Sequence, residues 1–118
     1  MAEATHTGGC HCGKVRFEAV LDLDRTVECN CSICSKRGWI LSAAPAGKFR
    51  LLSGESDLTD YQFNKEMIHH LFCSACGTQP FARGATPDGK EMVMVNVRCL
   101  DDADVSKLSP QHFDGKKL

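Results

Sequence analysis

Seven of the eight cysteines in this 118-residue chain lie in three short clusters. The first is a Cys-X-Cys pair, the second joins Cys-X-Cys to Cys-X-X-Cys, and the third is a Cys-X-X-Cys pair. Their members are Cys10 and Cys12, then Cys29, Cys31 and Cys34, then Cys73 and Cys76. A short segment with either spacing can place two thiolates on one ion, as in zinc sites. The clusters therefore predict metal binding.

The same cysteine content would also suit a small secreted protein that is held together by disulfides. Residues 1–9, however, are polar and contain no apolar stretch of the kind found in export signals. We therefore expect a cytoplasmic protein whose thiols stay reduced, and metal binding is favoured over disulfides and over free thiols in the core. No run of about 18 apolar residues is present, so we expect no association with a membrane.

Length and composition limit the number of domains and the kinds of partner that the chain can have. With 42% hydrophobic residues, the 118-residue chain is long enough for one domain and too short for two, so residues 1–118 are predicted to form a single zinc domain. The formal net charge of -1 gives no general attraction for nucleic acid, which is therefore not an expected partner.

The elements that must position the cysteines are predicted to be β-strands, because apolar residues recur mostly at every second position. In residues 14–20, Val15, Phe17 and Ala19 alternate with charged residues, as in a half-buried strand. Further strands are predicted at residues 39–43, 48–52, 58–63, 67–72 and 91–97, with turns at residues 54, 64–65 and 87–89. Residues 101–108 are predicted to be helical, because acidic residues open them. The fold class is therefore mainly β, with one short C-terminal helix.

Zinc geometry restricts the backbone around each cysteine pair. Two sulfurs bound at about 2.3 Å to a tetrahedral zinc lie about 3.8 Å apart, whereas residues i and i+2 of a flat strand are nearly twice as far apart. Each Cys-X-Cys pair is therefore expected on a bend at the end of a strand. Gly13 follows Cys12 and Gly77 follows Cys76, and a glycine at that position lets the chain turn back at positive φ.

The glycine positions suggest how the sulfurs are divided between two zinc ions. The two pairs followed by glycine are predicted to form a closed, structural site with four thiolates. This four-cysteine group consists of Cys10, Cys12, Cys73 and Cys76. The remaining three cysteines, Cys29, Cys31 and Cys34, leave one coordination position open, as in catalytic zinc sites. A second structural site, completed by Cys99 or a histidine, remains the alternative.

Several segments together resemble one known family, the glutathione-dependent formaldehyde-activating enzymes, also called the centromere-protein-V-like domain. The segments that carry the resemblance are Gly9-Cys10-His11-Cys12-Gly13-Lys14-Val15-Arg16-Phe17-Glu18, Cys29-Asn30-Cys31-Ser32-Ile33-Cys34, Phe72-Cys73-Ser74-Ala75-Cys76-Gly77-Thr78 and Leu100-Asp101-Asp102. The resemblance implies a zinc-stapled β-tent fold of stacked antiparallel sheets. It also implies two zinc ions per chain, divided between the same two cysteine groups. Partial occupancy is expected at the open site, because three ligands hold zinc less tightly than four.

The resemblance further implies a carbon–sulfur lyase that joins glutathione, or a related thiol, to a small aldehyde, as in S-hydroxymethylglutathione synthesis. Cys29, Cys31 and Cys34 would then hold the functional zinc, and the thiol and the aldehyde would be the partners. Four cations are available to meet substrate carboxylates, although a solvated surface role is favoured for each. They are Lys36 and Arg37 beside the second cluster, and Arg83 and Arg98 elsewhere. The alternative is a non-catalytic, zinc-stabilised binding module for protein or nucleic acid.

Overall fold

The computed structural model describes residues 3–62, 68–86 and 88–113, and these form two β-sheets and one α-helix. The helix is α1 (Ser32–Arg37). The strands are β1 (Ala4–Gly9), β2 (Arg16–Leu21), β3 (Val27–Cys29), β4 (Leu41–Pro45), β5 (Phe49–Ser53), β6 (Leu58–Tyr61), β7 (Ile68–Cys73), β8 (Phe81–Ala85), β9 (Glu91–Asn96) and β10 (Gln111–Phe113). The prediction of a mainly β fold with stacked sheets is confirmed. No helix in the described ranges is both long and apolar enough to cross a membrane.

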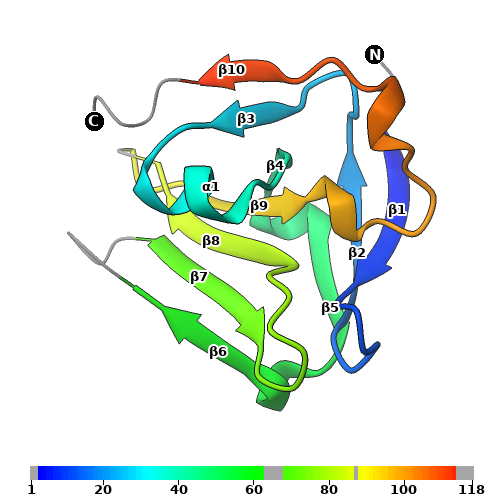
Figure 1. The fold of residues 1–118 in the computed structure, drawn as a ribbon, viewed down its shortest axis with the longest axis vertical. Coiled ribbons are helices and arrows are strands. Elements are labelled where there is room, and N and C mark those ends of the chain that lie inside the picture. The colour runs from blue at the N-terminus through cyan, green and yellow to red at the C-terminus, as the bar shows by residue number, and fades with distance from the viewer. Residues whose placement is uncertain (1–2, 63–67, 87, 114–118) are drawn as a thin grey trace.

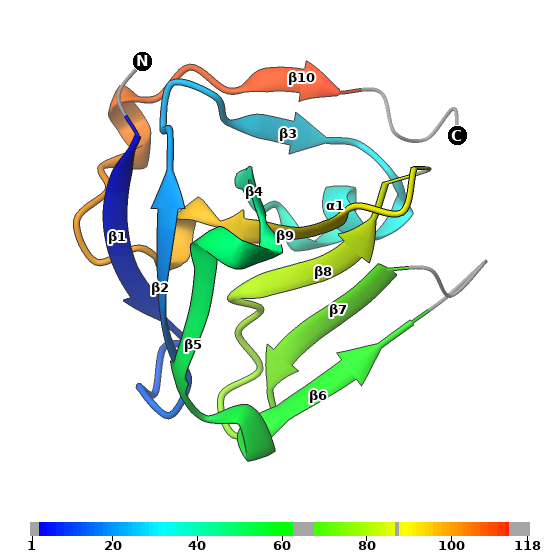
Figure 2. The same cartoon turned by 180° about the vertical axis from the view of Figure 1, so that it is seen from behind.

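The two sheets differ in size. The smaller has the strand order β1-β2-β5 and the larger has the order β10-β3-β4-β9-β8-β7-β6. Neighbouring strands are antiparallel except β10 and β3, which are parallel. Figures 1 and 2 show β1, β2 and β5 running nearly vertically, while β6, β7 and β8 cross the molecule obliquely.

At β8 the larger sheet is packed on both faces, and neighbouring residues of this strand point to opposite sides. On one face, Phe81 of β8 packs against Phe17 and Phe49 of the smaller sheet, with ring centroids 6.3 Å and 4.6 Å away. On the other face, the next residue, Ala82, packs with Cys34 and Trp39. Accordingly, α1 lies in front of β9 in Figure 1 and behind it in Figure 2. One cysteine of the second cluster is thus buried on the face away from the smaller sheet.

The strand predictions succeed where the apolar alternation is strong. Val15, Phe17 and Ala19 are fully buried, as predicted for one face of a strand, and Phe17 and Ala19 lie in β2. The other predicted strands overlap β4, β5, β6, β7 and β9, with the first of these starting two residues later than predicted. Residues 63–67 and 87 lie outside the described residues. Two predicted strand ends, the whole predicted turn at 64–65 and the first residue of the predicted turn at 87–89 fall on them. The sequence did not predict β1, β3, β8 or β10.

The predicted helix at residues 101–108 is wrong, because the structure has only a 3-10 turn at Val105–Lys107 there. The acidic residues that suggested a helix start are used in contacts between distant segments. Asp101 accepts hydrogen bonds from Arg16 at 3.1 Å and Thr7 at 2.8 Å, and Asp102 pairs with His6 at 3.1 Å. These contacts fasten the segment to β1 and β2. The α-helix of the protein is instead α1, within the second cysteine cluster.

Candidate metal centres and an adjoining cleft

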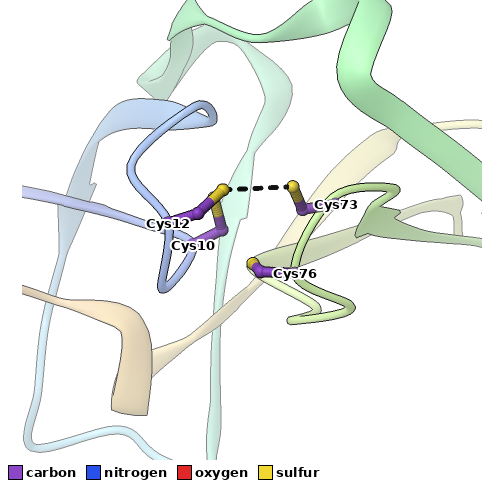
Figure 3. A group of neighbouring side chains, drawn as sticks. All are labelled: Cys10, Cys12, Cys73 and Cys76. Carbon is purple, nitrogen blue, oxygen red and sulfur yellow. Dashed lines mark hydrogen bonds between the residues drawn. The ribbon is translucent and has the colours of Figure 1, made fainter.

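The four-cysteine group joins two turns that are far apart in sequence. Cys10 and Cys12 lie in the turn between β1 and β2, Cys73 ends β7, and Cys76 lies in the turn that follows (Figure 3). The Sγ atoms of Cys10 and Cys12 are 3.6 Å apart, and those of Cys12 and Cys73 are 3.7 Å apart. These distances match the spacing of about 3.8 Å that a tetrahedral zinc requires. All four sulfurs lie within 4.8 Å of one another, so the group could hold one metal ion.

Glycine shapes both turns, as the sequence predicted. Gly13 has a φ of 86° and Gly77 a φ of 80°, which residues with a side chain rarely adopt. The amide of Gly77 donates to the carbonyl oxygen of Cys73 at 2.7 Å and thereby closes the second turn. In the first turn, the amide of Val15 donates to Sγ of Cys10 at 3.3 Å. Backbone donors of this kind stabilise a thiolate and orient it toward the ion.

The charges within the four-cysteine group also favour a cation. Hydrogen bonds with the side chain and backbone of Thr78 lower the pKa of Cys76 to about 5. A hydrogen bond from the backbone of Lys14 lowers the pKa of Cys12, but desolvation and hydrogen bonds with the other three sulfurs outweigh it, and the result is a pKa of about 11. At neutral pH the group therefore carries negative charge yet cannot ionise completely. A divalent cation would supply the missing compensation.

The three-cysteine group is built from a strand end and one helical turn. Cys29 ends β3, Cys31 caps the start of α1, and Cys34 follows one turn later. Residues i and i+3 lie on the same side of a helix, so the last two sulfurs approach each other. All three sulfurs lie within 4.8 Å of one another, and the amide of Cys31 donates to Sγ of Cys29 at 3.4 Å. This group, too, could hold a metal ion.

Trp39 contacts the three-cysteine group through Cys34. Its indole Nε1 donates to Sγ of Cys34 at 3.2 Å, and both residues are buried. Burial raises the pKa of Cys34 to about 12, and repulsion from Cys29 and Cys31 acts in the same direction, whereas the Trp39 hydrogen bond opposes it. Burial also raises the pKa of Cys31, but hydrogen bonds from α1 and the two neighbouring cysteines leave it below the ordinary value.

Cys99 belongs to neither group of sulfurs. Its Sγ donates to the carbonyl oxygen of Gln79 at 3.7 Å. Burial raises its pKa to about 11, with contributions from the charges of Cys10 and Cys76, so Cys99 is close to the four-cysteine group. In the described part of the chain, neither Cys99 nor a histidine joins Cys29, Cys31 and Cys34.

A cleft of about 400 Å³ adjoins the three-cysteine group. Its walls come from the end of α1 and Trp39, two residues after the helix, from the end of β7 and the segment that follows it, and from the end of β9. The lining residues are Arg37, Trp39, Phe72, Gly77, Thr78, Gln79 and Asn96. Trp39 therefore lines the cleft and also donates a hydrogen bond to Cys34. Gly77 and Thr78, which line the cleft as well, directly follow Cys76 in the chain.

The sequence analysis missed α1 and Gln79, although signals for the helix were present. Cys31 and Cys34 are separated by one helical turn, Lys36 and Arg37 provide a basic last turn, and Gly38 ends the helix with a φ of 64°. A helix of six residues has too few positions for a recognisable apolar period, so these end signals were the available evidence. Nothing in the sequence singles out Gln79, because its importance arises from contacts between distant segments.

The fold and the cysteine geometry define a small, mainly β protein with two candidate metal centres, one of four sulfurs and one of three. The family model for the glutathione-dependent formaldehyde-activating enzyme matches residues 5–114, and the chain belongs to this family. A crystal structure of a Rhodobacter sphaeroides protein is similar, with a TM-score of 0.80 and 31% sequence identity. The match covers 90% of this chain and 97% of that chain. Family membership supports a formaldehyde-activating, glutathione-related function.

Proposed function

We propose that the protein is a zinc-dependent enzyme of the carbon–sulfur lyase type, which joins glutathione or a related thiol to formaldehyde or another small aldehyde. The observation that carries this proposal is a group of three cysteines, with no fourth protein ligand among the described residues, beside a cleft in a member of this family. We further propose two zinc ions per chain, a structural one and a functional one. The thiol chemistry suits the cytoplasm, where thiols stay reduced.

The two cysteine groups suit their proposed roles. Cys10, Cys12, Cys73 and Cys76 would hold the structural ion, because four thiolates fill a tetrahedral site. Cys29, Cys31 and Cys34 would hold the functional ion and leave one position for an outside ligand. Zinc bound by these three sulfurs would lower the pKa of a thiol that reached the open position and would so make thiolate available at neutral pH.

The reaction itself is an addition of sulfur to a carbonyl carbon. The thiol proton passes to solvent, a sulfur lone pair forms the new carbon–sulfur bond, and the π electrons of the aldehyde move to oxygen. That oxygen then takes a proton from solvent, so the product is a hemithioacetal and no oxidant or reductant is required. The protein residues hold the reactants in place: Trp39 fixes Cys34 through its indole N–H, and the cleft receives the remainder of the thiol.

Exchange of formaldehyde on glutathione, followed by nuclear magnetic resonance, tests the proposal. The zinc-loaded protein should accelerate exchange between glutathione and S-hydroxymethylglutathione above the uncatalysed rate. Cys31→Ser should lose most of the acceleration, because it removes a ligand of the functional ion. Cys99→Ser is the matched control, since it makes the same replacement at a cysteine outside both sulfur groups.

The two variants separate catalysis from general damage to the fold. Lost acceleration in Cys31→Ser, with retained acceleration in Cys99→Ser, would support the proposal. If wild-type protein with two bound zinc ions gave no acceleration for glutathione or for a panel of other thiols and small aldehydes, the enzymatic proposal would be wrong. A non-catalytic binding module would then be the better description.

A further inference from the structure

Arg37 is the charged residue of the cleft beside the three-cysteine group. No aspartate or glutamate is among the residues that line this cleft. The ion pairs between described residues also leave Arg37 without a carboxylate partner, although Arg16, Arg25 and Arg50 each have one. A guanidinium group in a cleft without an acidic residue is suited to an anion, and its planar donors fit a carboxylate especially well.

The Arg37 side chain is also held in place. Its guanidinium carbon lies 5.7 Å from the centroid of the Phe72 ring, which provides a cation–π contact. Nη1 of Arg37 donates to Oε1 of Gln79, and Asn96 in turn donates from Nδ2 to the carbonyl oxygen of Gln79 at 2.9 Å. Three residues from three different segments thus orient this one cation. A surface arginine with no function other than solvation needs no such support.

Gln79 supplies an independent observation at the same wall. It is only 6% exposed, and its Nε2 has no hydrogen-bond partner among the described residues. Because Oε1 faces Arg37, the amide donors of Nε2 are left without an acceptor. A buried donor in this state is costly unless an acceptor is provided. A carboxylate bound at Arg37 would bring acceptor oxygen atoms to this wall of the cleft.

The cleft and the sulfur group share one helix. Cys34 and Arg37 are three positions apart in α1, so their side chains lie on the same side of the helix. Trp39, which lines the cleft, donates to Sγ of Cys34. A ligand whose sulfur lies at the three-cysteine group could therefore extend its remaining atoms along the cleft toward Arg37.

We propose that this cleft binds a carboxylate of the thiol substrate and that Arg37, positioned by Gln79 and Phe72, selects carboxylate-bearing thiols over neutral ones. This inference rests on the proposed function for the identity of the ligand as a thiol. The recognition itself involves residues outside the two cysteine groups. The ligand class is a thiol peptide or thiol acid with a carboxylate several bonds away from its sulfur.

A fluorescence titration tests the carboxylate site without requiring turnover. The chain has one tryptophan, Trp39, which lines the cleft, so its emission should report an occupant. The zinc-loaded protein is titrated with S-methylglutathione, which has no free thiol, and with the diethyl ester of S-methylglutathione. The acid should bind at least about tenfold more tightly than the ester, as expected for a charge-assisted hydrogen bond.

Matched variants assign the difference to one side chain. Arg37→Gln should remove the preference for the acid, and Arg37→Lys should retain part of it, because lysine keeps the charge but not the planar donors. Lys36→Gln makes the same charge change one position away on α1, outside the cleft lining, and should leave the preference intact. Thermal unfolding of each variant shows whether the fold is retained.

Equal affinity for acid and ester, no binding of the acid, or an equal effect of Arg37→Gln and Lys36→Gln would overturn the inference. The wild-type comparison of acid with ester decides the question even if Arg37→Gln does not fold. Formaldehyde exchange with glutathione and with its diethyl ester separates this inference from the proposed function. Equal acceleration for both thiols would support the enzymatic function and refute the carboxylate site. Tighter binding of the acid without any acceleration would support the carboxylate site and refute the enzymatic function.

Discussion

Loss of the four-cysteine centre should destabilise the protein more than loss of the three-cysteine centre. The perturbations are the double replacement Cys10→Ser/Cys12→Ser and the single replacement Cys31→Ser. The first removes both sulfurs of the turn between β1 and β2, so that no ion can join this turn to Cys73 and Cys76. The second leaves only two sulfurs in the three-cysteine group. The difference arises from the length of chain that each ion would cross-link. Cys12 and Cys73 are 61 positions apart, whereas Cys29 and Cys34 are five positions apart.

The loop-closure entropy of a cross-link gives the magnitudes. Closing a loop of the longer length stabilises the folded state by about 4 kcal/mol, and closing the shorter loop stabilises it by about 2 kcal/mol. For a chain of this size, each kcal/mol corresponds to about 4 °C in the unfolding midpoint. We therefore expect the midpoint to fall by about 15 °C in Cys10→Ser/Cys12→Ser and by about 8 °C in Cys31→Ser.

Scanning calorimetry of the zinc-loaded proteins measures both midpoints, and Cys99→Ser controls for the replacement of a partly buried sulfur. Zinc content, measured on the same samples, should be close to two per chain in the wild type and in the control and close to one in Cys31→Ser. A midpoint that falls as far in Cys31→Ser as in Cys10→Ser/Cys12→Ser would refute the division into a structural and a functional centre.

Three further predictions follow from individual residues. Gly54→Ala should lower the free energy of unfolding by about 3 kcal/mol, because φ is 89° and a Cβ would lie 2.4 Å from a backbone oxygen. Gly89→Ala, at a similar φ of 88° but with open space around the Cβ, should lower it by about 1 kcal/mol. Equal losses for the two variants in chemical denaturation would contradict this contrast. Trp39→Phe should weaken zinc binding at the three-cysteine group by about tenfold, because Cys34 loses a hydrogen bond. Competition with a chelator measures this change in affinity. Unchanged affinity at that site would show that the indole N–H is dispensable. His70 is buried, and desolvation lowers its pKa below 6.5, so its imidazole should titrate below that value when followed by nuclear magnetic resonance. The stability that neutral His70 contributes should be present at higher pH and should decrease as pH falls through the lowered pKa. A titration midpoint above 6.5 would be inconsistent with the burial.

The strands and the sulfur groups could be anticipated to different degrees. The alternation around Phe17 predicted β2, because apolar residues on the buried face of a half-buried strand alternate with polar residues on its exposed face. In contrast, β10 is exposed along its whole length, so its residues carry no apolar signal. It pairs with β3 through contacts such as the amide of Asn30 donating to the carbonyl oxygen of Phe113, which only the folded chain brings together.

The candidate site shows the same limit. The Cys-X-X-Cys spacing and the glycines after Cys12 and Cys76 were sufficient to predict which sulfurs gather, because ligand geometry acts over a few residues. The spacing could not indicate that Arg37 faces a cleft, since this depends on Gln79 and Phe72 from other strands and turns. Local chemistry was therefore predictable, whereas the surroundings of the metal centre required the structure.

Absorption spectroscopy of the cobalt-substituted protein tests the central claim most directly, because sulfur-to-cobalt charge-transfer bands report the number of bound thiolates. Addition of glutathione should increase these bands by the contribution of one further thiolate per chain, and the increase should be absent when Cys29, Cys31 and Cys34 are all replaced by serine. A spectrum of the wild-type protein that does not change with glutathione would contradict an open position at the three-cysteine centre.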